Sequence, residues 1–143
     1  MSYQKLYTAK AKATGGRDGR AISSDNVIDL ALTTPKELGG LGKQGATNPE
    51  QLFAAGYAAC FDSALNLVAR FEKQTIVGSS VAADVSLGHE GDKYDIAVDL
   101  HVNIPGLEQA QAEDLVAKAH QICPYSRATR GNIEVNLTTS THA

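Results

Sequence analysis

The stretch that decides the fold is Asn48-Pro-Glu-Gln-Leu-Phe-Ala-Ala-Gly-Tyr-Ala-Ala-Cys-Phe61. Asn48 is a good helix N-cap, Pro49 suits the first helical position, and the glutamine three residues after the cap can complete a capping box. We therefore predict a long helix from Pro49 to about Lys73. Because its first half carries almost no charge after Glu50, we expect that half to be buried on nearly all sides.

Strand-like alternation of apolar and polar residues flanks this helix on both sides. The runs at 81–88 and 94–104 should pair as an antiparallel hairpin. A second, amphipathic helix over 107–122 should end at Cys123, because Pro124 disfavours helical geometry in the residue before it. The glycines and proline of 33–47 predict a loop without regular structure. The other predicted strands are 9–13, 21–24, 27–32 and 133–137.

Composition limits the classes of protein to consider. The chain has 143 residues, 43% of them hydrophobic, which suffices for one core, so we expect a single domain over 1–143. A net charge of −3 without a lysine or arginine run disfavours nucleic acid and anionic membrane surfaces as partners. The N-terminus lacks an export-signal pattern, and no stretch has roughly 18 to 20 continuous apolar residues, so we expect a cytoplasmic protein without membrane insertion.

Cys60 and Cys123 are the only two cysteines of the chain. A permanent disulfide is disfavoured in a reducing compartment, which leaves inert core residues, metal ligands or a cycling redox pair. Taken alone, Cys60 fits a small apolar core residue. Cys123 favours the redox alternative, because a cysteine at a proline-broken helix end can meet another sulfur. His120 and Cys123 form a His-x-x-Cys pair, but a zinc site wants four ligands, so we expect no metal.

A thiolate is the reactive form of cysteine, and burial of Cys60 would disfavour it, so a cation must come from elsewhere in the fold. Arg17 is the best candidate, because the glycines around it allow positive φ angles, and Arg20 is the second. Glu50 lies about three turns before Cys60 and could hold the guanidinium. Alternatively, Glu50 is a first-turn carboxylate favoured by the helix dipole, and the glycine-rich segment is a plain hairpin turn.

Several large apolar residues are expected in the core, although some could wall an apolar pocket beside the thiol. They are Phe53, Tyr57, Phe61, Leu38 and Leu41.

Four segments, in order and spread over the whole chain, together resemble one protein family. Their sequences closely resemble those of the organic hydroperoxide resistance proteins, a branch of the OsmC superfamily. The segments are 13–20 (Ala-Thr-Gly-Gly-Arg-Asp-Gly-Arg), 35–40 (Pro-Lys-Glu-Leu-Gly-Gly), 47–61 (which holds the stretch quoted first) and 123–132 (Cys-Pro-Tyr-Ser-Arg-Ala-Thr-Arg-Gly-Asn).

The resemblance implies an α+β fold with antiparallel sheets and two long helices packed between them, in an intertwined homodimer. It implies a cysteine-based peroxidase that reduces organic and fatty-acid hydroperoxides in oxidative-stress defence. Carried over by position, Cys60 resembles the peroxidatic cysteine and Cys123 the resolving cysteine, while Arg17 resembles a mobile arginine and Glu50 its anchor.

The same resemblance implies that no bound cofactor is needed and that dihydrolipoyl groups on a lipoylated protein act as the external reductant. One position departs from the family pattern. Arg127 stands where a smaller polar residue, often asparagine, is expected, and it adds a charge near Cys123.

Three other functions compete with this one. The protein could be a stress-induced sensor that passes oxidation to a partner without turnover, or a structural dimer with inert thiols. It could also be an osmotically induced peroxidase of the sibling OsmC type. The Gly-Gly-Arg-Asp-Gly and Cys-Pro-Tyr-Ser segments favour the organic hydroperoxide branch over that sibling.

Overall fold

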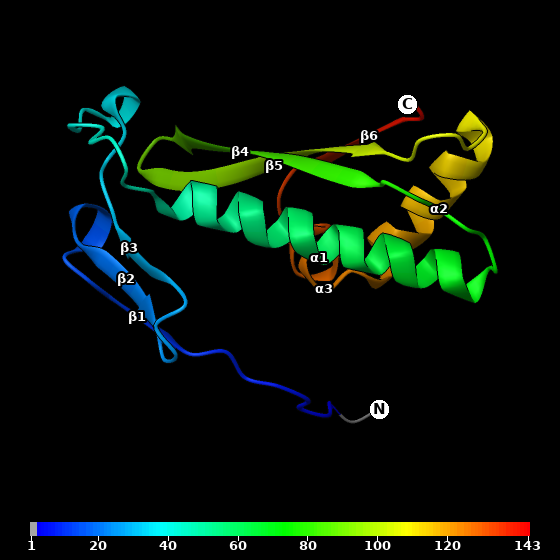
Figure 1. Cartoon of the computed structure of the whole chain (residues 1–143). Coiled ribbons are helices and arrows are strands. Elements are labelled where there is room, and N and C mark those ends of the chain that lie inside the picture. The colour runs from blue at the N-terminus through cyan, green and yellow to red at the C-terminus, as the bar shows by residue number, and fades with distance from the viewer. Residues whose placement is uncertain (1–2) are drawn as a thin grey trace. The chain divides into compact units, whose positions relative to one another are not determined.

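The computed structural model describes residues 3–143, which form two compact units (Figure 1). One unit runs through Pro49, and the other comprises Glu50–Ala143. The single domain expected over 1–143 stays a prediction.

The N-terminal unit is a small antiparallel sheet with almost no core of its own. Its strands β1 (Ala11–Thr14), β2 (Arg20–Ser23) and β3 (Asp29–Ala31) pair in the order β1-β2-β3. One short 3-10 helix, η1 (Gly16–Asp18), lies between β1 and β2, and another, η2 (Lys36–Leu38), interrupts the loop that was expected to lack regular structure. Leu32 and Thr33 are the only residues of this unit, among those described, that are classed as buried.

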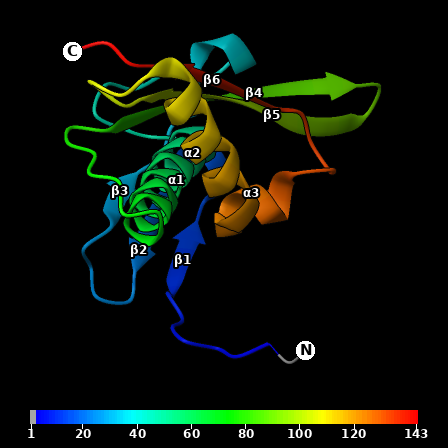
Figure 2. The same ribbon diagram turned by 90° about the vertical axis from the view of Figure 1, so that its right-hand side faces the viewer.

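The C-terminal unit contains three helices and a three-stranded sheet in the order β4-β5-β6. Figure 2 shows the three helices on one side of this sheet. The predicted long helix, hairpin and amphipathic helix are confirmed, whereas α3 was not predicted. The elements are α1 (Pro49–Phe71), β4 (Ser80–Glu90), β5 (Lys93–Asn103), α2 (Gln109–Ile122), α3 (Pro124–Thr129) and β6 (Val135–Ser140).

The expectation of purely antiparallel sheets is wrong for β6. This strand runs parallel to β5, with Val98 opposite Val135 and Leu100 opposite Leu137. Parallel neighbours need a crossover connection, and here α2 and α3 supply it. The α+β class itself is confirmed.

The core of the C-terminal unit lies between α1, α2 and the inner face of β5. From α1 it takes Tyr57, Phe61 and Leu65, all fully buried. The first half of α1 was predicted to be buried on nearly all sides, but Ala55 and Ala59 are exposed in this unit. The buried stripe of α1 covers one side only, so the alanine-rich side is left outside the core of this unit.

By length and composition, α1 could also cross a membrane. It has no unbroken apolar run of that length, but its charges are few. This is weak evidence for a span, because the core helix of a soluble protein passes the same test.

Candidate thiol site

Cys60 and Cys123 face each other inside the C-terminal unit. Their Sγ atoms are 3.8 Å apart, and both thiols are free. Cys60 is half-buried on α1, while Cys123 is fully buried between α2 and α3. A disulfide needs about 2.0 Å between the sulfurs, so a small local movement would bring them into bonding distance.

Local sequence explains the position of Cys123. Its backbone N–H still donates to the Ala119 carbonyl at 2.8 Å, and its own φ and ψ of −60° and 123° are extended. Pro124 imposes that extended geometry on the residue before it and then occupies the first turn of α3. Cys123 therefore sits at a sharp corner between two helices.

The surroundings of Cys60 within this unit favour the neutral thiol. Burial raises the pKa of Cys60 above its ordinary value, and the neighbouring Cys123 raises it further. The opposing influence is a hydrogen bond from the backbone N–H of Tyr125, which lowers the pKa by favouring the thiolate. None of these influences is a cation. An effective nucleophile therefore needs a positive charge from another part of the protein.

Three aromatic rings cluster along α1 and α3 near the thiols. The Phe53 ring lies 6.0 Å from Tyr57 and 5.9 Å from Tyr125, and the rings of Tyr57 and Tyr125 are 5.7 Å apart. Tyr57 is fully buried, whereas Tyr125 is 38% exposed. Phe53 and Tyr125 thus combine apolar surface with access from outside. Tyr125 was not expected as a wall residue, although it lies in the quoted Cys-Pro-Tyr-Ser segment.

Arg17, the predicted cation, lies in the N-terminal unit. Arg17 is half-buried within η1, which begins at Gly16 (φ 59°) directly after Gly15 (φ 75°). The carboxylate of Asp18 accepts hydrogen bonds from the backbone N–H and the hydroxyl of Thr34, both at 2.9 Å. These bonds lower the pKa of Asp18 and tie the arginine-bearing turn to the chain after β3.

Arg20, the second cation candidate, forms an ion pair with Asp29 of β3. Glu50 is half-buried in the first turn of α1. Leu38 and Leu41, at and after η2, are 45% and 70% exposed. Pairing of Arg17 with Glu50, and a pocket that includes the two leucines, stay predictions.

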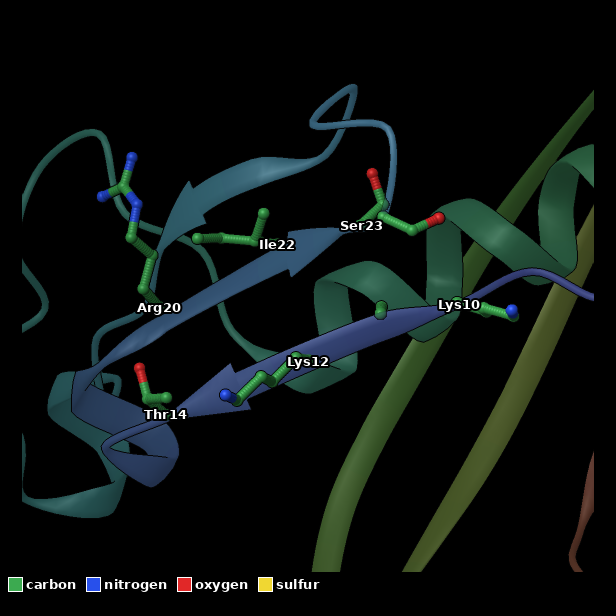
Figure 3. Close-up of a pocket in the computed structure, with 8 residues that line it drawn as sticks. Lys10, Lys12, Thr14, Arg20, Ile22 and Ser23 are labelled. Atoms are coloured by element: carbon green, nitrogen blue, oxygen red, sulfur yellow. The ribbon is translucent and has the colours of Figure 1, made fainter.

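A hollow of about 420 Å³ on the N-terminal unit is the main alternative as a site (Figure 3). Its lining includes Lys10, which directly precedes β1, and Lys12 within β1. Arg20 and Ile22 of β2 also line it. The hollow offers cations and hydroxyls, but its lining has neither a thiol nor a histidine. It therefore lacks the groups that would make it a redox site.

Within the described residues, no group of three or more histidine, cysteine or acidic side chains is arranged so that it could hold a metal ion. His120, which forms the His-x-x-Cys pair with Cys123, has its Nδ1 atom 2.8 Å from the Ser126 hydroxyl.

Comparisons with known proteins agree with this fold. Residues 42–138 match the family described as OsmC-like protein. The chain is 55% identical over 134 residues to an organic hydroperoxide resistance protein of Xanthomonas axonopodis pv. citri (strain 306), covering 93% of this chain and 94% of that relative. It is 52% identical over 136 residues to the organic hydroperoxide resistance protein OhrA of Bacillus subtilis (strain 168), with 94% and 96% covered.

A solved structure of an organic hydroperoxide resistance protein from Legionella pneumophila superposes with a TM-score of 0.91 at 51% identity, covering 96% of this chain and 99% of that one. The fold and the matched residues define the class, and the chain belongs to the family of OsmC-like proteins. Relatives at 55% and 52% identity narrow this to the branch of organic hydroperoxide resistance proteins, which confirms the resemblance.

Proposed function

We propose that the protein is a thiol-dependent peroxidase that reduces organic hydroperoxides to alcohols and so serves in defence against organic peroxides. The observation that carries the proposal is the apposition of two free sulfurs, 3.8 Å apart, on different helices. The organic hydroperoxide resistance proteins at 55% and 52% identity support the substrate class.

The electrons for the reaction come from the two cysteines and an external dithiol. The Cys60 thiolate attacks the terminal oxygen of the hydroperoxide, the O–O bond breaks, and the alkoxide takes up a proton and leaves as the alcohol. Cys60 is then a sulfenic acid, oxidised by two electrons. The Cys123 thiol displaces water from that sulfur to form the Cys60–Cys123 disulfide, which protects Cys60 from further, irreversible oxidation.

A cation has to stabilise the thiolate and the charge that develops on the leaving oxygen. Burial and Cys123 both raise the pKa of Cys60, so the C-terminal unit alone does not supply that stabilisation. We assign this role to Arg17, with Glu50 as the carboxylate that holds its guanidinium. The glycine-flanked turn around Arg17 and its anchoring through Asp18 suit an arginine that moves as part of a small loop.

Preference for organic peroxides follows from apolar surface beside the thiol. Each methylene group removed from water contributes about 0.8 kcal/mol to binding, and hydrogen peroxide has none to bury. Phe53 and Tyr57, with Leu38 and Leu41 from the other unit, are the proposed pocket residues, and the partly exposed ring of Tyr125 adds to them.

The external dithiol is proposed to be a dihydrolipoyl group carried by a lipoylated protein, acting as a substrate. It reduces the disulfide by thiol exchange and becomes a cyclic disulfide itself. The proposed cycle uses no metal, flavin or haem, and we place it in the cytoplasm, where such disulfides are reduced again.

We further propose that the active form is a homodimer. The described part of the N-terminal unit buries little, and its first residues include Tyr3, Leu6 and Tyr7 at 88%, 93% and 83% exposure. The exposed alanine side of α1 is a second uncovered apolar surface. A second copy of the chain would cover surfaces of this kind, which monomers rarely leave open.

A stopped-flow comparison of an organic hydroperoxide with hydrogen peroxide on the reduced protein tests the proposal. We expect the organic substrate to react faster and dihydrolipoamide to sustain turnover. A single oxidation without turnover would instead favour the sensor, and slow alkylation of Cys60 at neutral pH would favour an inert structural dimer.

A further inference from the structure

A chain of buried polar groups lies behind the thiol pair. The Tyr57 hydroxyl of α1 is 2.8 Å from the Ser126 hydroxyl and 3.2 Å from the Thr129 hydroxyl of α3. The Ser126 hydroxyl is in turn 2.8 Å from Nδ1 of His120 on α2. Tyr57 and Ser126 are fully buried, and Thr129 is 7% exposed. The chain thus connects all three helices of the unit; its hydroxyl groups are buried, and His120 at its end is half-buried.

The spacing of these residues places them on the same helix faces as the cysteines. Cys123, Ser126 and Thr129 recur every third residue, and all three are buried along one side of α3. Tyr57 and Cys60 are also three positions apart, so they share a face of α1. The sulfur–sulfur contact at 3.8 Å and the hydroxyl contact at 2.8 Å are therefore two neighbouring links across one α1–α3 interface.

One assignment of protons gives every contact in this chain a donor and an acceptor. The single hydroxyl proton of Thr129 is donated to the Tyr125 carbonyl at 2.9 Å, so its oxygen accepts from Tyr57. Tyr57 then has no proton left for Ser126, and Ser126 must donate to Tyr57. In this assignment the Ser126 oxygen accepts from His120, with the ring proton of His120 on Nδ1.

We propose that this chain, from His120 through Ser126 and Tyr57 to Thr129, is a positioning network that fixes α3 against α1 and holds Cys123 and the Tyr125 amide beside Cys60. The inference rests on the proposed peroxidase function. It adds to the proposed site residues that do not touch the substrate but hold the two cysteines in place. A buried polar chain that is fully satisfied rigidifies its surroundings and selects one arrangement of the helices. Formation of the disulfide depends on that arrangement, because the two sulfurs react only when they are correctly aligned.

The network makes two variants informative. Ser126→Ala removes the central link, and Tyr57→Phe removes one hydroxyl while it keeps the buried ring. Ser79→Ala is a matched control, since the Ser79 hydroxyl also donates at 2.8 Å to an α1 side chain, Asp62. Asp62 lies two residues after Cys60, and helix residues two apart do not share a face.

The experiment follows reduced protein after one equivalent of cumene hydroperoxide by stopped flow. Oxidation of Cys60 appears as a phase that depends on peroxide concentration, and disulfide formation as a later phase that does not. We expect Ser126→Ala and Tyr57→Phe to slow the later phase roughly tenfold, as expected for loss of an alignment held by a hydrogen bond, and Ser79→Ala to leave it unchanged. If Ser126→Ala does not fold, Tyr57→Phe carries the test.

A second readout separates positioning from general stability. In wild-type protein, ¹⁵N NMR of the His120 ring should show the proton on Nδ1, and Tyr57→Phe should remove that preference. One result would overturn the network and leave the proposed function intact. The wild type would show both phases, and disulfide formation in Ser126→Ala and Tyr57→Phe would be as fast as in Ser79→Ala. Absence of either phase in the wild type would contradict the proposed function and the positioning role together.

Discussion

The two units of the molecule differ in how they hold their functional groups. In the C-terminal unit the sulfurs lie within a packed core, where Cys123, Phe61 and Leu65 are fully buried. In the N-terminal unit the Arg17 turn belongs to a small sheet in which, among the described residues, only Leu32 and Thr33 are buried. Packing thus fixes the position of the proposed nucleophile, Cys60, whereas the proposed cation, Arg17, lies in a unit that buries few of its described residues. In the proposed mechanism, the packed unit would align the two sulfurs for disulfide formation, and the small sheet would carry the charge for the step with substrate.

The largest expected effect distinguishes the roles of the two cysteines in the C-terminal unit. Cys60→Ser should abolish hydroperoxide consumption, because Cys123 is fully buried and a serine hydroxyl is too weak a nucleophile to replace the Cys60 thiolate. Cys123→Ser should allow about one turnover and then accumulate sulfinic acid on Cys60, since the protecting disulfide cannot form. Peroxide consumption assays with mass spectrometry of the Cys60 peptide check both outcomes. Steady-state activity in Cys60→Ser would end the assignment.

The next largest effect tests the role of Arg17 in the N-terminal unit. Arg17→Ala should slow the reaction with hydroperoxide by about 100-fold at neutral pH, because the guanidinium no longer stabilises the charge of the transition state. Burial, followed by Cys123, raises the pKa of Cys60, so the residual rate should increase with pH as the thiol ionises.

Arg20→Ala is the matched control for Arg17→Ala. Arg20 is already paired with Asp29, so its loss should change the rate by no more than about twofold, within the range of a surface ion pair. Equal losses in the two variants would mean that the turn acts through its net charge and that Arg17 has no specific role.

A smaller effect compares stability in the two units. Leu65→Ala removes a fully buried side chain from the C-terminal core and should lower the free energy of unfolding by about 2 to 5 kcal/mol. Val27→Ala in the N-terminal unit changes a residue that is 82% exposed and should stay within about 0.5 kcal/mol. Urea unfolding of both variants measures the difference. A cost for Val27→Ala as large as for Leu65→Ala would show that the N-terminal unit has a core of its own.

The smallest expected effect concerns pH and His120. Burial lowers the pKa of His120, and the positive charge of Arg130 lowers it further, so the folded protein keeps this ring neutral. The unfolded chain takes up a proton as pH falls below the ordinary value of 6.5, and the stability present above that pH is lost as pH falls through the folded pKa. His120→Asn keeps a polar atom at the site of Nδ1 and should show a smaller decrease of Tm between about pH 7 and pH 5. Identical slopes would exclude His120 as the titrating group.

Much of the fold was predictable because local signals agreed with it. The N-cap and proline at 48 and 49 mark the start of α1, and the strict alternation at 94–104 marks β5. The parallel pairing of β6 was not predictable, because alternation gives a strand but not the direction of its neighbour. α3 was missed because it is a single short stretch after Pro124, with no room for a helical period. The exposed side of α1 was missed because alanine fits a core and a surface equally well.

The site was predicted mainly from the chemistry of particular residue types and less from their spacing along the chain. Two lone cysteines and a proline pointed to the pair that lies at 3.8 Å. The Tyr125 amide and the His120–Ser126 contact were not foreseen, because a backbone donor and a buried hydroxyl leave no pattern in a single sequence. The pairing of Arg17 with Glu50 depends on how distant segments come together, which local sequence does not encode.

The central claim is that Cys60 and Cys123 of one chain become bonded during the reaction. Reduced protein treated with one equivalent of cumene hydroperoxide, blocked with a thiol reagent and digested, should give by mass spectrometry a peptide pair linked through Cys60 and Cys123 of the same chain, with neither thiol alkylated. A Cys60 sulfinic acid beside an alkylated Cys123, or a disulfide only between different chains, would contradict the account.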